Sequence, residues 1–324
     1  MRRREFITLV TGTAAWPLTA RAQQQSENVP KIGLLWPGVT LPAPPRMESF
    51  RRGLREQGYI DGRNIIIELR YSQRGAQQLP QLAAELVGTN VDVIWAAGDL
   101  APKVAQQATS TIPIVAVADD MLGAGLVTSL SRPTGNTTGL TILAPELSVK
   151  RLEVLKGLFP DLSRVAALWD PTTGTAQVTA TKAAGQSLNM NLQILEVRSR
   201  DDLAPAFEAA VKEHAEAVNT FSSPFLASLY REIIALAAEN RLPAIYQWRE
   251  HAEAGGLASY GPSLAEMWRQ SAIMVTKLLR GAKPSDLPVE QPAKFELVIN
   301  QKTVKTLGLE LPLAFLIRAD DVIE

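Results

Sequence analysis

Polar and aromatic side chains gather at the ends of six expected strands, and their chemistry suits them to hold a small polar molecule. Carboxylates, hydroxyls, amide groups at helix starts and flat aromatic faces all occur there. In parallel sheets, ligands bind beyond the carboxyl ends of the strands, so this rule selects the loops without any motif. The candidate ligand-binding residues are Trp36, Pro37, Gly38, Gly98, Asp99, Asp119, Asp120, Trp169, Asp170, Thr172, Thr175, Ser222, Ser223, Phe225, Gln247 and Trp248.

Each of these residues also has a purely structural interpretation. Asp99 can cap its own helix, and the pair Asp119-Asp120 can form a solvated turn. Ser222 and Ser223 are good helix caps, and the tryptophans can be packing residues. The case for binding is collective, because polar residues follow every expected strand on the one side that would face a cleft.

Patterns typical of catalysis are missing from the sequence. It has no phosphate-loop pattern, no G-x-G-x-x-G after the first expected strand and no G-x-S-x-G elbow. The chain has no Cys, which excludes disulfides, thiolate metal sites and a Cys nucleophile. His214 and His251 are the two histidines and form a poor basis for zinc or a triad, although His251 follows a strand-end loop and stays open as a ligand contact. We expect no enzyme, no cofactor and no metal.

The first 22 residues have the features of an export signal. Arg2 to Arg4 form a basic start, and Phe6 to Trp16 is an apolar run too short to span a bilayer. Ala20-Arg21-Ala22 fits a small-x-small cleavage site, and Arg3 to Ile7 resembles the twin-arginine signal. A disordered basic N-terminus and the general export route are the alternatives. We expect a soluble periplasmic protein, without the Cys that a lipid anchor would need.

The two halves of the chain resemble each other at a spacing of about 130 residues, which is the size of a domain rather than of a solenoid repeat. The segment Lys31 to Pro37 resembles Arg164 to Asp170. A strand that runs into a helix near Gly139 recurs at Gly256 to Pro262. We therefore expect two similar lobes that are joined by strands and have a cleft between them.

Strands and helices alternate through both halves, which predicts an α/β fold with parallel sheets covered on both faces. Lobe one is expected to comprise residues 28–143 and about 263–290, and lobe two residues 144–262 and about 291–324. The membership of the C-terminal segment stays open. Expected strands lie at 31–36, 65–71, 91–97, 112–118, 140–143, 165–169, 192–197, 217–221, 243–247 and 295–299.

Long runs of the sequence resemble the ABC-transporter substrate-binding family typified by tryptophan-binding proteins. They include D-G-R-N-I-I-I-E, A-P-E-L-S-V-K-R-L-E-V-L-K, E-A-G-G-L-A-S-Y-G-P and L-P-V-E-Q-P-A-K-F-E-L-V-I-N, within residues 30–324. The resemblance implies a periplasmic-binding-protein type I fold: two Rossmann-like lobes, three crossovers and a hinge. It also implies uptake of a small solute with an ABC permease of the inner membrane, and no catalysis.

Two loops depart from the family's pattern. Family members read G-D-P where this chain has Asp119-Asp120-Met121, and a Gly-Thr-Pro-like turn where it has Gly98-Asp99-Leu100. Both segments belong to the expected binding loops. The departures therefore leave the identity of the ligand open.

The candidate residues suit a zwitterion with an apolar or aromatic body. Carboxylates in lobe one can pair with an ammonium, and hydroxyls and amides at helix starts in lobe two favour an anion. Aromatic faces lie between these poles. An amino acid is the first hypothesis, and an aromatic acid without an amine is the alternative.

Other functional classes remain less favoured. A sensor that presents a ligand to a receptor has the same two lobes, whereas an exported enzyme would need a nucleophile that is not evident. Equal numbers of Lys+Arg and Asp+Glu, 33 of each, give no sign of nucleic-acid binding. We expect a monomer.

Overall fold

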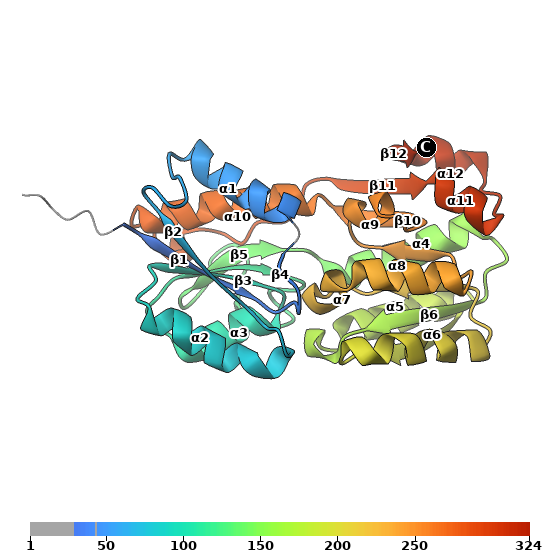
Figure 1. Ribbon diagram of the computed structural model, residues 1–324, viewed down its shortest axis with the longest axis horizontal. Helices are drawn as coiled ribbons and strands as arrows, with labels where there is room; N and C mark the ends of the chain where they lie inside the picture. Colours follow the sequence, from blue (N-terminus) through green and yellow to red (C-terminus); the bar gives the residue numbers. More distant parts are fainter. Residues whose placement is uncertain (1–28, 43) are drawn as a thin grey trace, which may run out of the picture.

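The computed structural model describes residues 29–42 and 44–324. The predicted export signal at residues 1–22 lies outside the described residues. Within them, the chain forms two α/β lobes that lie side by side (Figure 1), each built on its own sheet. Both sheets are mostly parallel with interleaved helices, which confirms the expected fold class.

The first lobe has a five-stranded sheet in the order β2-β1-β3-β4-β5, and all its strands are parallel. Its strands are β1 (Lys31–Trp36), β2 (Ile66–Tyr71), β3 (Val93–Ala97), β4 (Ile114–Ala118) and β5 (Thr137–Thr141). Helices α1 (Pro44–Glu56) and α10 (Leu264–Leu279) cover one face, and α2 (Leu79–Gly88) and α3 (Leu100–Ala108) cover the other (Figure 1). The central strands are buried on both faces because helices cover both, so they read as continuous apolar runs.

The second lobe has a seven-stranded sheet in the order β12-β11-β10-β9-β8-β6-β7. Its strands are β6 (Arg164–Trp169), β7 (Asn191–Glu196), β8 (Ala217–Thr220), β9 (Ala244–Tyr246), β10 (Ala258–Pro262), β11 (Phe295–Asn300) and β12 (Asp321–Ile323). Its helices are α4 (Ala144–Leu158), α5 (Ala176–Ser187), α6 (Leu203–Lys212), α7 (Pro224–Ser228), α8 (Tyr230–Glu239), α9 (Arg249–Glu253), α11 (Gln301–Leu307) and α12 (Leu313–Arg318). The described residues also form short 3-10 helices in both lobes. The second lobe contains η2 (Pro171–Thr173) and η3 (Arg200–Asp202), and the first lobe contains η1 (Ala76–Gln78) and η4 (Pro284–Asp286).

The C-terminal part of this second sheet differs from the parallel arrangement expected from the sequence. Strand β11 pairs with β10 in the antiparallel direction, and β12 then adds to β11 in parallel. Strand β11 enters its sheet directly from the other lobe, with no crossover helix on its own sheet, and an antiparallel neighbour needs no such helix.

The chain passes between the lobes three times: from β5 to α4, from β10 to α10, and between η4 and β11. At the first passage Leu143 has a φ of 63°, the left-handed conformation that costs energy for a residue with a side chain. Pro145 follows in the first turn of α4, where its missing N–H is tolerated. Helix α10 starts where the Ser263 hydroxyl accepts a hydrogen bond from the Glu266 amide at 3.3 Å.

Position 139 in β5 has to be a glycine because β4 lies too close for a side chain. Its φ is 150°, and a Cβ atom there would lie 1.9 Å from the carbonyl oxygen of Ala116. We expect Gly139→Ala to lower the free energy of unfolding by about 3 kcal/mol or more, because β4 and β5 would have to separate. Urea unfolding measures this change.

Gly125→Ala is the matched control, since Gly125 has a φ of 67° and nothing within 4 Å of its added Cβ. This variant should lose only the left-handed strain, about 1 kcal/mol. Equal losses in the two variants would show that the close approach of β4 does not constrain Gly139.

Candidate functional site

The carboxyl ends of β1, β3 and β4 in the first lobe face those of β6, β8 and β9 in the second. Several hydrogen bonds, each involving at least one side chain, cross between the lobes here. Ser222 Oγ donates to Asp119 Oδ1 at 2.5 Å, Thr40 Oγ1 donates to the Ser228 carbonyl at 3.3 Å, and the Val39 amide donates to Ser228 Oγ at 3.3 Å. The lobes are therefore in contact, and the cleft between them is closed.

A cavity inside this closed cleft is lined by residues from both lobes. Its lining comprises Trp36, Arg46, Ala97, Gly98, Val117, Asp119, Ile142, Ser222, Ser223, Pro224, Ala227, Trp248, Leu264 and Trp268. Three of these are tryptophans, and Arg46 and Asp119 are the ionisable side chains of this lining. The cavity combines a broad apolar wall with one cation and one anion.

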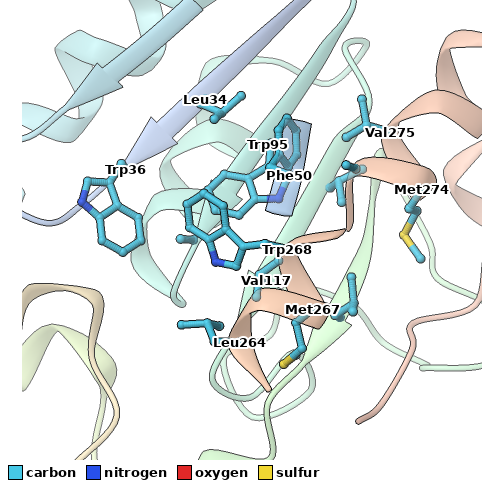
Figure 2. Close-up of a cluster of buried hydrophobic side chains, with 14 of the residues drawn as sticks. Leu34, Trp36, Phe50, Trp95, Val117, Leu264, Met267, Trp268, Met274 and Val275 are labelled. Atoms are coloured by element: carbon cyan, nitrogen blue, oxygen red, sulfur yellow. The ribbon is translucent and has the colours of Figure 1, made fainter. Parts of the chain in front are cut away.

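The tryptophan wall is held by the core of the first lobe (Figure 2). The Trp36 and Trp268 rings meet edge to face, with centroids 5.9 Å apart. Behind them Trp95 packs on Trp268 at 4.4 Å, and its Nε1 donates to Ser271 Oγ at 2.9 Å. Phe50 meets both Trp95 and Trp268 edge to face. These contacts fix the ring orientations, so the wall is rigid.

Asp119 is the acidic residue of the cavity and is only 2% exposed. Its Oδ1 accepts the hydrogen bond from Ser222, while Oδ2 has no partner among the described residues. Burial raises the pKa of Asp119 from its ordinary value of 3.8 to about 6. The Ser222 hydrogen bond and the Arg151 charge lower this pKa, and the Asp170 charge raises it. A buried carboxylate oxygen of this kind favours a positively charged partner.

The other two predicted acidic residues of the first lobe, Asp99 and Asp120, stabilise the loop after β4. Asp99 accepts hydrogen bonds from the amides of Asp119 and Asp120 at 2.9 and 3.2 Å. Burial and then the nearby Asp119 charge raise the pKa of Asp99 well above its ordinary value. Asp120 accepts from the Gly123 amide at 2.9 Å. Asp99 therefore positions Asp119, and Asp120 stabilises its own turn.

The hydroxyls expected to hold an anion are occupied by carboxylates instead. Ser223 Oγ and Thr172 Oγ1 donate to Asp170 Oδ2 at 2.6 and 2.8 Å, and Ser222 donates to Asp119. Asp170 also accepts from the Thr172 amide. Thr175 is exposed and lines an outer groove between the lobes with Asp99, Lys103, Asp120 and Thr172, among others.

Five further predicted residues do not belong to the lining of this cavity. Trp169 donates its Nε1 to the Gly174 carbonyl at 2.9 Å, and Gln247 donates to the Thr220 carbonyl at 2.5 Å. Pro37 and Phe225 line an adjoining hollow with Gly98, Asp99 and others. Gly38 lies against Trp36, since an added Cβ would approach its indole at 2.5 Å.

Two buried arginines near the cavity were not predicted from the sequence. Arg46 of α1 is 3% exposed, and its Nε donates to Glu250 Oε1 of α9 at 2.6 Å. Arg151 of α4 is 1% exposed and donates to Ser148 Oγ at 2.9 Å. Burial lowers the pKa of Arg151 to about 9, while the Asp119 charge opposes this shift. Both arginines lie on helices, so a rule that selects residues beyond the carboxyl ends of strands does not identify them.

Trp268 was also missed, although the sequence carries a signal for it. Leu264, Trp268, Ala272 and Val275 recur at helical spacing along α10, and all are buried. His251, considered as a ligand contact, is 1% exposed and stacks on Tyr230 with centroids 4.9 Å apart. Burial, and then the Arg46 and Arg151 charges, lower the pKa of His251 well below its ordinary value.

Within the described residues, no group of three or more His, Cys, Asp or Glu side chains could hold a metal ion. None of the helices in the described part of the chain is both long and apolar enough to cross a membrane.

The raised pKa of Asp119 makes stability depend on pH. Between about pH 4 and pH 6 the unfolded carboxyl group ionises while the folded one keeps its proton, so its contribution to stability falls as the pH rises. Relative to Asp119→Asn, the wild-type protein should lose about 2–3 kcal/mol of unfolding free energy from about pH 4 to pH 7.

Urea unfolding of both proteins across this range measures the difference. The comparison cancels the carboxylates that both proteins share, such as Glu216 and Glu266, whose pKa values are lowered. If the difference in unfolding free energy between the two proteins did not change with pH, the Asp119 carboxyl group would not have the raised pKa that its burial predicts.

Comparison with known proteins shows what this chain resembles. The model of a family described as ABC transporter substrate binding protein matches residues 45–323. A tyrosine-binding protein of Clostridioides difficile (strain R20291) is 25% identical over 267 residues, covering 81% of this chain and 76% of the relative.

Two solved structures share the fold over 91% of this chain and 99% of their own. One is the ABC domain in complex with L-Trp from Streptococcus pneumonia, with a TM-score of 0.82 and 26% identity. The other is a conserved domain protein from Vibrio cholerae O1 biovar eltor, with a TM-score of 0.83 and 24% identity, a likeness that shows the fold alone.

Proposed function

This chain belongs to the ABC transporter substrate binding protein family, and from that premise we propose that it captures an amino acid with an aromatic body between its two lobes. The family is one of substrate-binding proteins and not of enzymes. The protein then returns its ligand chemically unchanged.

The observation that carries the proposal is the position of Asp119 in the tryptophan-lined cavity. Its Oδ2 is buried without a partner among the residues that the structure describes, and the cavity beside it is lined by Trp36, Trp248 and Trp268. A ligand ammonium supplies the charge that the carboxylate lacks, and charge-assisted hydrogen bonds are the strong ones. An aromatic or large apolar side chain fits the flat tryptophan faces.

The relatives support the same class of ligand. One is named a tyrosine-binding protein, and one structure holds L-Trp. Both ligands are aromatic amino acids, which join an ammonium to a flat apolar body. The departures of this chain in the loops at Gly98-Asp99-Leu100 and Asp119-Asp120-Met121 leave the choice among such amino acids to experiment.

We also propose that the protein acts in the periplasm and delivers its solute to an ABC permease of the inner membrane. The support for export is the sequence of residues 1–22, with its basic start, apolar run and cleavage site. The support for delivery is the family, whose description names the transporter.

Calorimetry tests the nature of the ligand. Tryptophan, phenylalanine, tyrosine and leucine should be compared with their deaminated acids. We expect an aromatic amino acid to bind at least 10-fold more tightly than its deaminated analogue, because only the amine pairs with Asp119. If the deaminated acids bind as tightly, the protein binds aromatic acids and the amine plays no part.

Asp119→Asn is the matched variant for this measurement. It keeps an oxygen that can accept from Ser222 but removes the charge, so the affinity for the amino acid should fall by about 10- to 100-fold. Asp120→Asn is the control, since Asp120 makes its hydrogen bond to its own turn. An equal loss in both variants would argue against a specific role for Asp119.

X-ray scattering tests the closing of the lobes. Three chain crossings join two rigid sheets, so we expect the ligand-free protein to open by bending at these segments and to compact when an aromatic amino acid is added. An unchanged radius of gyration, with binding confirmed by calorimetry, would contradict closure by hinge bending.

A further inference from the structure

The Arg46 side chain lies on the cavity wall with a pairing that leaves part of its guanidinium free. Its Nε and Nη2 both contact the single oxygen Oε1 of Glu250. Its Nη1 makes no hydrogen bond with the described residues. A guanidinium has five N–H donors in a rigid fork, so one carboxylate oxygen does not satisfy it.

The charges in the cavity lining match those of a zwitterion. Arg46 is its cation and Asp119 its anion, and both are almost fully buried. Two buried charges that face one cavity are stabilised by a ligand that brings the complementary pair. The serine and threonine hydroxyls cannot replace Arg46 in this role, since they donate to Asp119 and Asp170.

We propose that Arg46 binds the carboxylate of the ligand, and that Glu250 holds the guanidinium in place only when the lobes are closed. Arg46 belongs to α1 of the first lobe and Glu250 to α9 of the second, 204 positions apart in the chain. Closure therefore orients the guanidinium against the carboxylate while Asp119 holds the ammonium. Arg46 sets the specificity for α-amino acids over amines, and Glu250 is a positioning residue.

The proposal rests on the proposed function, and the test uses two pairs of probes to separate them. The pairs are L-tryptophan with tryptamine and L-tyrosine with tyramine, in which the amine lacks only the carboxylate. Calorimetry on the full chain should show that the amino acid of the pair binds at least 10-fold more tightly than its amine. An amine that binds as tightly as its amino acid overturns the role of Arg46 without any variant.

Arg46→Gln should lower the affinity for the amino acid by about 10- to 150-fold and change that for the amine by less than about threefold. Arg46→Lys should restore part of the amino-acid affinity, because it keeps the charge but not the fork. Glu250→Ala should lower the affinity for the amino acid more than the affinity for the amine, because it removes the group that positions the guanidinium against the carboxylate.

Three other results would overturn the proposal. If Arg46→Gln weakens the amino acid and the amine equally, Arg46 is only a contact between the lobes. If it weakens neither, Arg46 does not contribute to binding. If the wild-type protein binds no amino acid of either pair, the proposed function fails as well. The near-ultraviolet circular dichroism of the tryptophans serves as the control that each protein tested is folded.

Discussion

The two lobes meet where two carboxylates are removed from water, and the burial of one of them, Asp119, is stabilised by the opposite lobe. Asp119 comes from the first lobe and accepts its hydrogen bond from Ser222 of the second. Asp170, in the second lobe, is held by Ser223 and Thr172. An unpaired buried charge is costly, so each partner that a lobe contributes lowers the energy of the closed state. The closed cleft is thus stabilised by contributions from both lobes, and the ammonium that we propose for the ligand would join the same set of partners.

The segments that join the lobes differ from the sheets on either side. The sheets are buried on both faces and paired in parallel over most of their strands, which makes them rigid. The first passage contains Leu143 in the left-handed conformation, and Gly139 just before it is pressed against β4. We therefore expect motion between the lobes to be confined to a few residues whose backbone angles can change, while the strand ends keep their arrangement within each lobe.

The apolar wall of the cavity is also part of a hydrophobic core. Trp268 contributes to the cavity on one side and packs on Trp95 and Phe50 on the other. Because Trp95 is fixed by its hydrogen bond to Ser271, the rings need little ordering when a ligand arrives. Pre-organisation of this kind lowers the entropy cost of binding. Fold and site are consequently built from the same side chains, and helix α10 supplies both.

The sequence by itself determined the two α/β lobes and the strand ends that carry polar groups, because alternating patterns and helix caps are local signals. That is how Asp119, Ser222, Trp36 and Trp248 could be found. The partners of these residues were decided by the tertiary structure, since Ser222 and Asp119 are 103 positions apart and Arg46 and Glu250 are 204 apart. The sequence suggested that the serines would bind an anionic group of the ligand, whereas in the folded protein they donate hydrogen bonds to the carboxylates of Asp119 and Asp170. Arg46 and Trp268 line the cavity from helices α1 and α10, and only the packing of these two helices on the first sheet brings their side chains to its strand ends.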